Sequence, residues 1–435
     1  MNKISPSRTE QTQSPLAAHY QKTVLSNGLR IVTEEVPYVR SISIGVWINV
    51  GSRDESNENN GISHFIEHMV FKGTKNYNLQ DIARSLESVG GYLNAFTSKE
   101  HTCFYARALD THLTKAMSVI ADLVRYPLFD EKEIEKEKSV VLEELKNMED
   151  NPDELIHDYV DQHVYYKHPL ASPVIGTANN ISHFTNRNLI EYKRKHYLPE
   201  NMVVAASGNV RHESVVELVR KYFGEKTSTT RSHRRNRGPQ KHRAQTQVVE
   251  KPIMQAHVCM GTIGCSVKSH LRYPMLVMNT LLGEGMSSRL FQSLRERHGL
   301  GYTVYSFTNT MSDTGNFGVY TATDAKNVDR SIELITKEFE KLKATLVSSA
   351  ELKRTKSQLK GMMMLSLESM SSRMMRLGGS ELYYGNHITL DEIVRKIDAV
   401  SAGDISETAN KFLQIENFST VIFKPTASQH TNGNA

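Results

Sequence analysis

Two histidines and a glutamate lie close together in the segment His64-Phe65-Ile66-Glu67-His68. An α-helix turns about 100° per residue, so on a helix His68 lies about 40° to one side of His64 and Glu67 about 60° to the other. The apolar residues of the segment point the opposite way, which predicts a helix that is buried on one face and presents three polar groups to a cleft. Two histidines four residues apart can chelate one metal ion such as zinc, with the glutamate beside them to hold a water molecule. A solvated helix face with two surface histidines would give the same pattern.

A third metal ligand has to come from elsewhere, and residues 131–148 are rich in candidates. Their periodicity predicts a helix with a buried apolar stripe, and Glu137 and Glu144 lie two turns apart on one edge of that stripe. Glu143 points away from the stripe, into solvent. Because burying a lone carboxylate is costly, Glu137 and Glu144 are the candidates to bind or support the metal. The alternative is that both pair with Lys138 or with arginine side chains, and the periodicity alone does not decide between the two.

The elements that must position these residues follow one another in a similar order in the two halves of the chain. Strand-like alternation is found at residues 28–36, 41–52, 92–107, 201–210, 255–267 and 301–324. Helical periodicity is found at residues 112–126, 131–148, 213–223, 273–282 and 288–297. Gly91-Tyr92 and Gly301-Tyr302 open strands of similar pattern, and this faint repeat predicts two copies of one α+β unit.

Five parts are expected from this order. They are a leader at 1–20, an N-terminal catalytic domain at 21–226, a basic linker at 227–247, a homologous C-terminal domain at 248–425 and a tail at 426–435. The linker is polar, contains Gly238-Pro239 and is expected to be solvated and flexible. A tether to nucleic acid or to a membrane is the alternative for this segment.

The composition of the 435 residues is globular, with 39% apolar and 23% charged residues. The net charge of +5 is local, because residues 226–243 hold seven basic side chains and no acidic one, which leaves −2 for the rest. A nucleic-acid-binding face spread over the fold is therefore not expected. No uninterrupted apolar stretch approaches 18 residues, so no membrane span is expected.

The cysteines and the leader bear on the compartment. Cys103, Cys259 and Cys265 are too few and too scattered for a disulfide framework or a cysteine zinc site. This usage suits a reducing compartment, and we expect a cytoplasmic protein. The leader lacks the apolar centre of a secretory signal, while Glu10 and a single arginine argue against an organelle-targeting role.

The chain resembles the insulinase/pitrilysin zinc peptidases in several sequence stretches. Their His-x-x-Glu-His order is the inverse of the common zincin motif. The resemblance rests on HFIEH, on Glu144 lying 76 residues after His68, and on Glu137 seven residues before Glu144. Further matching stretches are HMVFKGT, GGYLNAFTSKEHTCFYAR, EKSVVLEEL, HPLASPVIGT, HYLPENMVVAASGNV and GEGMSSRLFQSLRERHGLGYTVYS. The resemblance covers about residues 21–425, and the length is similar to that of the short bacterial type and of the catalytic subunit of the mitochondrial processing peptidase.

The resemblance implies an α+β fold with two homologous α/β domains, mixed or antiparallel sheets flanked by helices, and a clam-shell dimer enclosing a chamber. The partner would be a second copy or an inactive relative. His64, His68 and Glu144 would bind one zinc ion, with Glu67 as general base and Glu137 supporting the site. The second half has no such motif, so one zinc ion per chain is expected.

The resemblance also implies residues that handle the substrate. Asn94 and Ala95 would lie on the strand that pairs with the peptide. Arg295 and Tyr302 would hold the substrate near the scissile bond, and in dimeric relatives they reach the metal from the partner chain. As alternatives, Arg295 is a surface helix residue and Tyr302 a plain core aromatic.

The function expected from residues and resemblance is that of a zinc-dependent endopeptidase, which hydrolyses peptides or processes N-terminal extensions inside a dimeric chamber. The partners would be peptides or unfolded segments, without nucleic acid or membrane. An assembly subunit without catalysis is the alternative, and the complete set of ligands argues against it.

Overall fold

The computed structural model describes residues 19–224, 235, 238–239 and 244–426 of the chain. Almost all of the expected leader and tail, and most of the expected linker, lie outside these residues. Two expected boundaries shift by a few residues, because the first strand already begins at His19 and the first strand of the second half begins at Thr246.

The first half is built around a six-stranded sheet in the order β1-β2-β6-β3-β5-β4. Its strands are β1 (His19–Val24), β2 (Arg30–Glu35), β3 (Ser41–Ile48), β4 (Tyr92–Thr97), β5 (Thr102–Leu109) and β6 (Met202–Gly208). Residues 92–107, which read as one strand pattern in the sequence, form the hairpin of β4 and β5. β4 is therefore an outer strand with one free edge.

The second half is built around a five-stranded sheet in the order β7-β11-β8-β10-β9. Its strands are β7 (Thr246–Lys251), β8 (Ala256–Ile263), β9 (Gly301–Thr310), β10 (Gly315–Thr323) and β11 (Ser419–Pro425). The expected strand region at 301–324 is again a hairpin, formed by β9 and β10.

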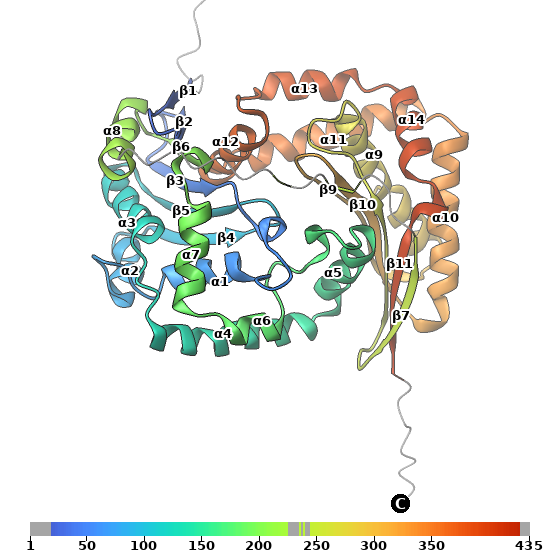
Figure 1. The fold of residues 1–435 in the computed structure, drawn as a ribbon. Coiled ribbons are helices and arrows are strands. Elements are labelled where there is room, and N and C mark those ends of the chain that lie inside the picture. The colour runs from blue at the N-terminus through green and yellow to red at the C-terminus, as the bar shows by residue number, and fades with distance from the viewer. Residues whose placement is uncertain (1–18, 225–234, 236–237, 240–243, 427–435) are drawn as a thin grey trace, which may run out of the picture.

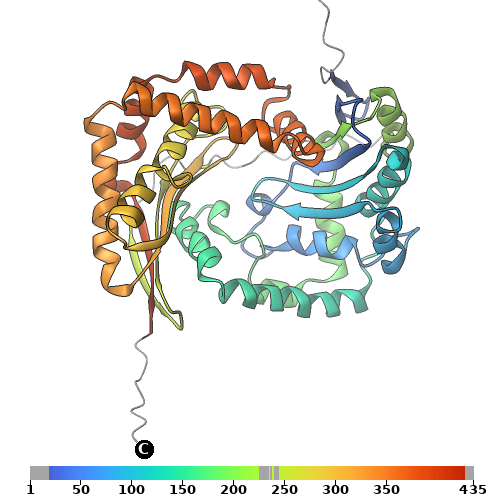
Figure 2. The same cartoon turned by 180° about the vertical axis from the view of Figure 1, so that it is seen from behind.

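The two sheets have the same topology once β1 is set aside. β2 pairs in parallel with β6, as β7 does with β11. β3 lies between β6 and β5, as β8 lies between β11 and β10, and all of these pairs are antiparallel. β4 and β9 are the corresponding outer strands. The prediction of two homologous α/β domains is confirmed, and the two halves lie side by side (Figures 1 and 2).

Helices cover both sheets. Those of the first half are α1 (Ile62–Val70), α2 (Leu79–Glu87), α3 (Leu113–Arg125), α4 (Glu131–Glu149), α5 (Pro152–Val164), α6 (Ala178–His183), α7 (Asn186–His196) and α8 (His212–Phe223). Those of the second half are α9 (Arg272–Gly283), α10 (Val328–Ala344), α11 (Ser349–Ser366), α12 (Met370–Tyr384), α13 (Leu390–Ala399) and α14 (Ala402–Phe412), with a π-helical segment at Phe291–Arg297.

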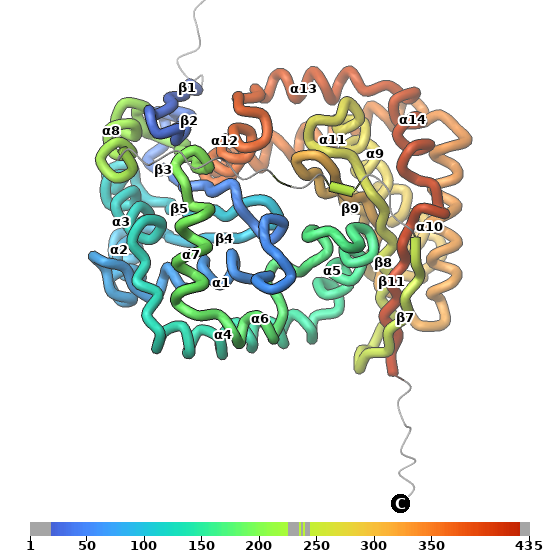
Figure 3. The backbone as a smooth tube through the Cα atoms, viewed as in Figure 1, coloured from blue at the N-terminus to red at the C-terminus, as the bar shows by residue number. Residues whose placement is uncertain are grey.

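One helix from each half packs on the sheet of the other half. α12 from the second half packs on the first sheet, where Met374 and Leu377 join the buried Trp47. α5 from the first half packs on the second sheet (Figure 3). There Val160 joins Cys259 and Phe423. The exchange buries apolar side chains of both halves against each other, which holds the two sheets in one unit.

The exchange explains why the alternation of β3 gives way to consecutive apolar residues at Val46-Trp47-Ile48. Ile42, Ile44 and Val46 point into the core formed with α1 and α3, whereas Trp47 points to α12 on the opposite face. A strand covered on both faces needs apolar residues at consecutive positions. Among the described residues, no helix is both long enough and apolar enough to cross a membrane.

Candidate metal centre

Helix α1 lies as its sequence predicts. Every residue from Gly61 to Val70 is buried except His64, Glu67 and His68, which are partly exposed. The apolar side chains of α1 enter the core of the first half. The buried face therefore fixes the rotation of the helix, and the two imidazoles and the carboxylate share the remaining face.

The carboxylate of Glu144 on α4 meets both imidazole rings. Its Oε1 lies 3.7 Å from His64 Nε2 and its Oε2 lies 3.4 Å from His68 Nε2, and the ligand atoms of the three residues all lie within 4.8 Å of one another. Two ligands of a tetrahedral zinc ion, each about 2.1 Å from it, lie about 3.4 Å apart. The donor set and its spacing thus fit a zinc ion held by two histidines and one glutamate.

The protonation of the two histidines differs. Burial, followed by the neighbouring His68, lowers the pKa of His64 to about 3, so its ring is neutral at physiological pH. Burial also acts to lower the pKa of His68, but Glu137 and Glu144 outweigh it and raise that pKa. A cation between these side chains would take the place of the proton on His68 Nε2.

Glu137 stands behind His68. Its Oε1 accepts a hydrogen bond from His68 Nδ1 at 2.9 Å and its Oε2 pairs with Lys72 Nζ at 2.6 Å, while only 3% of the side chain is exposed. Burial opposes ionisation, but the contacts with His68 and Lys72 lower the pKa of Glu137. An anionic Glu137 that holds Nδ1–H leaves Nε2 of the same ring free to bind a metal.

The helical-face prediction for α4 can be compared with these contacts. Glu143 is 65% exposed and pairs with Lys146, so it points into solvent as expected. The alternative that Glu137 and Glu144 pair with Lys138 is wrong, because Lys138 pairs with Glu135 instead.

Glu67 is held by a residue that the sequence analysis did not select. Thr97, at the end of β4, donates a hydrogen bond from Oγ1 to Glu67 Oε2 at 2.6 Å. Burial raises the pKa of Glu67, the Thr97 hydrogen bond and His68 act to lower it, and Glu144 adds to the rise. Thr97 lies three residues after Asn94 in the quoted stretch, but only the pairing of α1 with β4 brings it to Glu67.

The metal centre opens into a cleft of about 460 Å³. Its lining includes His64, Thr97 and Glu144. It continues along α4, α5 and the connection between them with Asn147, Met148, Asn151, Glu154 and Asp158, and is completed by Val174 and Ile175 from the segment before α6. No lysine or arginine of the described chain is among these residues. Burial, together with nearby Asp161 and against the opposing effect of Lys99, raises the pKa of Asp158. Glu154 and Asp158 were not selected in the sequence analysis, because nothing in it predicted that α5 borders the site.

The structure places Asn94 and Ala95 on β4, next to α1 and at the outer edge of the first sheet. Ala95 is 8% exposed. The free edge of β4 is thus near the candidate metal centre, and the role of Asn94 and Ala95 in pairing with a peptide stays a prediction.

The structure does not bring Arg295 and Tyr302 to the metal centre. Neither lines the cleft, and the two contact each other: Arg295 Nη1 donates to the carbonyl oxygen of Tyr302 at 3.2 Å, and its guanidinium lies 4.8 Å from the Tyr302 ring. Tyr302 is 74% exposed at the start of the outer strand β9, so the alternative of a core aromatic is wrong.

Comparison with known proteins adds relatives to this geometry. The sequence profile described as insulinase (peptidase family M16) matches residues 30–178, and the profile described as peptidase M16 inactive domain matches residues 183–359. A Bacillus subtilis protein named uncharacterized zinc protease YmxG is 41% identical over 92% of this chain and 97% of its own length. An uncharacterized zinc protease of Streptomyces coelicolor, SCO5738, is 38% identical over 90% of this chain and 87% of its own length.

A solved structure has a similar fold over nearly the whole chain. A protease from Helicobacter pylori superposes with a TM-score of 0.87 at 25% identity, covering 94% of this chain and 100% of that one.

Proposed function

The chain belongs to the insulinase family, peptidase family M16, and on that premise we propose that His64, His68 and Glu144 hold a catalytic zinc ion at the mouth of the cleft. The protein is a zinc metallopeptidase. The observation that carries the site assignment is the approach of one carboxylate to both imidazoles, at 3.4 and 3.7 Å, from a helix 76 residues away in sequence.

The side chains around the site divide the chemistry between them. When bound, zinc supplies a Lewis acid that polarises the peptide carbonyl and lowers the pKa of water to about 7. Glu67 accepts the proton from the attacking water and returns it to the leaving amine. Thr97 holds the Glu67 carboxylate in place through its 2.6 Å hydrogen bond, and Glu137 holds the ring of His68.

The substrate we propose is an extended peptide that pairs with the free edge of β4. Main-chain hydrogen bonds along an exposed edge give affinity with little sequence preference, and Asn94 and Ala95 would contact the peptide there. Glu154 and Asp158 continue the same cleft beyond Glu144. Among the described residues, the lining holds carboxylates and neither lysine nor arginine, which favours a lysine or arginine side chain of the substrate close to the scissile bond. Processing of basic N-terminal extensions is one activity that fits this preference.

The pair of the partly exposed Arg295 and the exposed Tyr302 supports a dimer, as a homodimer or with an inactive relative. Both residues lie outside the cleft of their own chain, Arg295 in the π-helical segment and Tyr302 at the start of the outer strand β9. We infer that they reach the cleft of a partner chain, where the Tyr302 hydroxyl would donate to the oxyanion of the tetrahedral intermediate. The three unbridged cysteines, all of them buried, support a reducing compartment.

Zinc content and hydrolysis of an internally quenched peptide test the central assignment. Glu67→Gln should retain one zinc ion per chain and lose hydrolysis, because it removes the proton acceptor and no ligand. Loss of zinc from this variant would contradict the role given to Glu67. Wild-type protein that binds no stoichiometric zinc would refute the proposal as a whole.

Mixing two inactive variants tests the dimer. Equal amounts of Glu67→Gln and Tyr302→Phe protein, unfolded and refolded together, should regain part of the activity if each site takes Tyr302 from the other chain. Mixed protein as inactive as its two components would contradict the shared site.

A further inference from the structure

Three consecutive residues with buried side chains connect the proposed metal-binding helix to the contact between the two halves. Arg53 and Asp54 belong to a 3₁₀ turn, η1 (Ser52–Asp54), and Glu55 follows it. Arg53 is 4% exposed, Glu55 is 5% exposed, and the side chain of Asp54 is 2% exposed. Their ionisable side chains contact different parts of the chain, and none of them has a part in the mechanism above.

Glu55 closes the N-terminal end of α1. Its Oε2 accepts hydrogen bonds from Gly61 N at 2.7 Å and from Asn60 Nδ2 at 3.0 Å, and its Oε1 accepts one from Ser63 N at 2.8 Å. The first N–H groups of a helix have no partner within the helix and need one from outside. Because Ser63 precedes His64 directly, the Glu55 carboxylate holds the backbone at the residue next to the first proposed ligand.

An external carboxylate is needed here because the helix cannot cap itself. The residue at the N-cap position is Gly61, which has no side chain to accept a hydrogen bond. Its φ of 96° lies in the left-handed region, and a Cβ at this position would lie 2.6 Å from the carbonyl oxygen of Ile175. A serine or aspartate in place of Gly61 would therefore be strained and would collide, so the cap has to come from Glu55.

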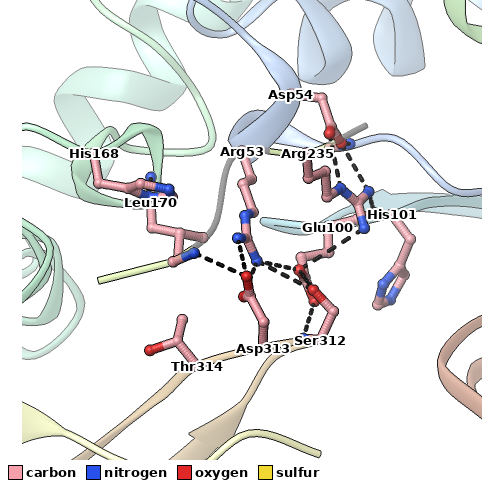
Figure 4. Close-up of polar contacts among 12 residues, drawn as sticks. Arg53, Asp54, Glu100, His101, His168, Leu170, Arg235, Ser312, Asp313 and Thr314 are labelled. Carbon is pink, nitrogen blue, oxygen red and sulfur yellow. Dashed lines mark hydrogen bonds and ion pairs between the residues drawn. The ribbon is translucent and has the colours of Figure 1, made fainter. Parts of the chain in front are cut away.

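Arg53 and Asp54 fasten the same turn to other parts of the chain (Figure 4). Arg53 donates to both carboxylate oxygens of Asp313, at 2.8 and 3.0 Å, and to Glu100 Oε1 at 2.7 Å. Asp313 belongs to the turn between β9 and β10 of the second half. Asp54 accepts from Arg235 at 2.7 and 2.8 Å. Arg235 lies in the segment expected to be a solvated linker, and at this residue the expectation is wrong, since only 16% of its side chain is exposed.

A second connection reaches the general base from the same cluster. Glu100 lies in the turn between β4 and β5 and accepts from Ser312 N at 2.9 Å and from Ser312 Oγ at 2.6 Å. Three residues before Glu100, Thr97 donates to Glu67. The turn of the second half that carries Ser312 and Asp313 thus contacts both segments that reach the active site.

We propose that residues 53–55 form a positioning segment, an inference that rests on the proposed zinc site. Contact of the β9–β10 turn with Arg53 holds Glu55 against the start of α1. The position of this end of the helix in turn sets where His64 and His68 present their rings. A buried ion-pair cluster is weak support for stability by itself, because desolvation offsets much of the attraction. A role in positioning the metal ligands would explain the buried cluster, whereas a gain in stability does not. The zinc site then reaches its binding geometry only when the second half is docked on the first.

Two variants of the full-length chain test the proposal. Glu55→Gln keeps the size of the side chain but puts an NH₂ group opposite a backbone N–H. Asp313→Asn keeps the shape at the far end of the segment and removes the charge opposite Arg53. Loss of a group that orients a metal ligand weakens metal affinity by about 10–100-fold. We expect the zinc Kd, measured by competition with a chelator, to rise about tenfold or more in Glu55→Gln and severalfold in Asp313→Asn.

A spectroscopic readout separates positioning from stability. In Co²⁺-substituted protein the visible absorption bands should shift in both variants, and kcat should fall with KM little changed. The matched control is Glu34→Gln, which breaks another ion pair between the halves, to Arg373 on α12 at 2.9 Å, with 7% of the Glu34 side chain exposed. It should lower the Tm as much as Asp313→Asn and leave the zinc Kd and the Co²⁺ spectrum unchanged.

The possible results distinguish failure of the positioning role from failure of the proposed zinc site. If Glu55→Gln fails to fold, Asp313→Asn alone carries the test. Wild-type zinc affinity and Co²⁺ bands in Asp313→Asn, with a Tm lowered as in the control, would overturn the positioning role and leave the zinc site standing. A wild-type protein that binds neither ion would refute the proposed function, and the inference with it.

Discussion

Replacing Glu137 by glutamine tests how the metal centre is organised, because Glu137 touches one proposed ligand and no substrate. Its two oxygens accept from His68 Nδ1 at 2.9 Å and from Lys72 Nζ at 2.6 Å. A glutamine has one oxygen for these two donors. If the oxygen stays with Lys72, the NH₂ group faces Nδ1 and favours the tautomer that is protonated on Nε2, which cannot bind a metal. If it stays with His68, the NH₂ group faces an ammonium.

Either arrangement loses one hydrogen bond to a charged group, which contributes about 1.5–3 kcal/mol. Converted at 1.4 kcal/mol per factor of ten, this is a rise in the zinc Kd of about 10–100-fold, the range found when groups behind metal ligands are removed. The effect on stability should be smaller, because 26% of the Lys72 side chain is exposed and its ammonium can turn to solvent.

Zinc affinity can be measured by chelator competition at neutral pH, and peptide hydrolysis at saturating zinc. We expect Glu137→Gln to regain much of its activity when zinc is added in excess. Glu133→Gln is the matched control, because Glu133 is on the same helix and its pair with Lys136 lies at the surface. Equal zinc Kd values for Glu137→Gln and Glu133→Gln would refute the reasoning about the tautomer of His68.

Three further predictions follow from the same geometry. Glu144→Gln should weaken zinc binding whereas Glu143→Gln should not, and equal Kd values for the two would contradict the facing of α4. Thr97→Val should lower kcat about tenfold and move the acidic limb of the kcat/KM profile to higher pH. The reason is that it removes a hydrogen bond that stabilises the charged form of Glu67. An unchanged pH profile would rule out that role of Thr97. Burial, and then the charge of Arg235, lower the pKa of His101 to about 4 against the opposing effect of Glu100. Because His101 has a pKa of about 6.5 in the unfolded chain, the unfolded chain binds more protons than the folded one between about pH 6.5 and 4. Stability should therefore fall on acidification through this window, by about 2–3 kcal/mol at pH 4.5 from His101 alone. In urea unfolding, His101→Gln should lose less stability than the wild type over the same pH range, by that amount.

Local patterns were sufficient for the elements that carry the site. The spacing of apolar residues in α1 is enough to orient His64, Glu67 and His68, because the buried face of a helix fixes its rotation. The same reasoning places Glu143 in solvent. The alternation within β3 and the repeat of Gly-Tyr at 91 and 301 indicate strands in two related halves, and the shared sheet topology agrees with them.

Contacts between distant segments could not be obtained in this way. Helical periodicity did not distinguish the roles of Glu137 and Glu144. The packing of α4 beside α1 makes Glu137 the partner of His68 Nδ1 and places the Glu144 carboxylate between both imidazole rings. The cap from Glu55 depends on a close approach of Gly61 to Ile175 that no spacing reveals.

The sequence by itself thus determined the family, the two related units and the residue types that can bind zinc, because each of these depends on order and spacing along the chain. The tertiary structure decided which carboxylate meets the imidazoles, that Thr97 holds Glu67, that α5 brings Glu154 and Asp158 to the cleft, and that Arg235 is paired with Asp54. The physical reason is that these side chains gain their partners only when helices and strands far apart in the sequence bury their apolar faces against one another.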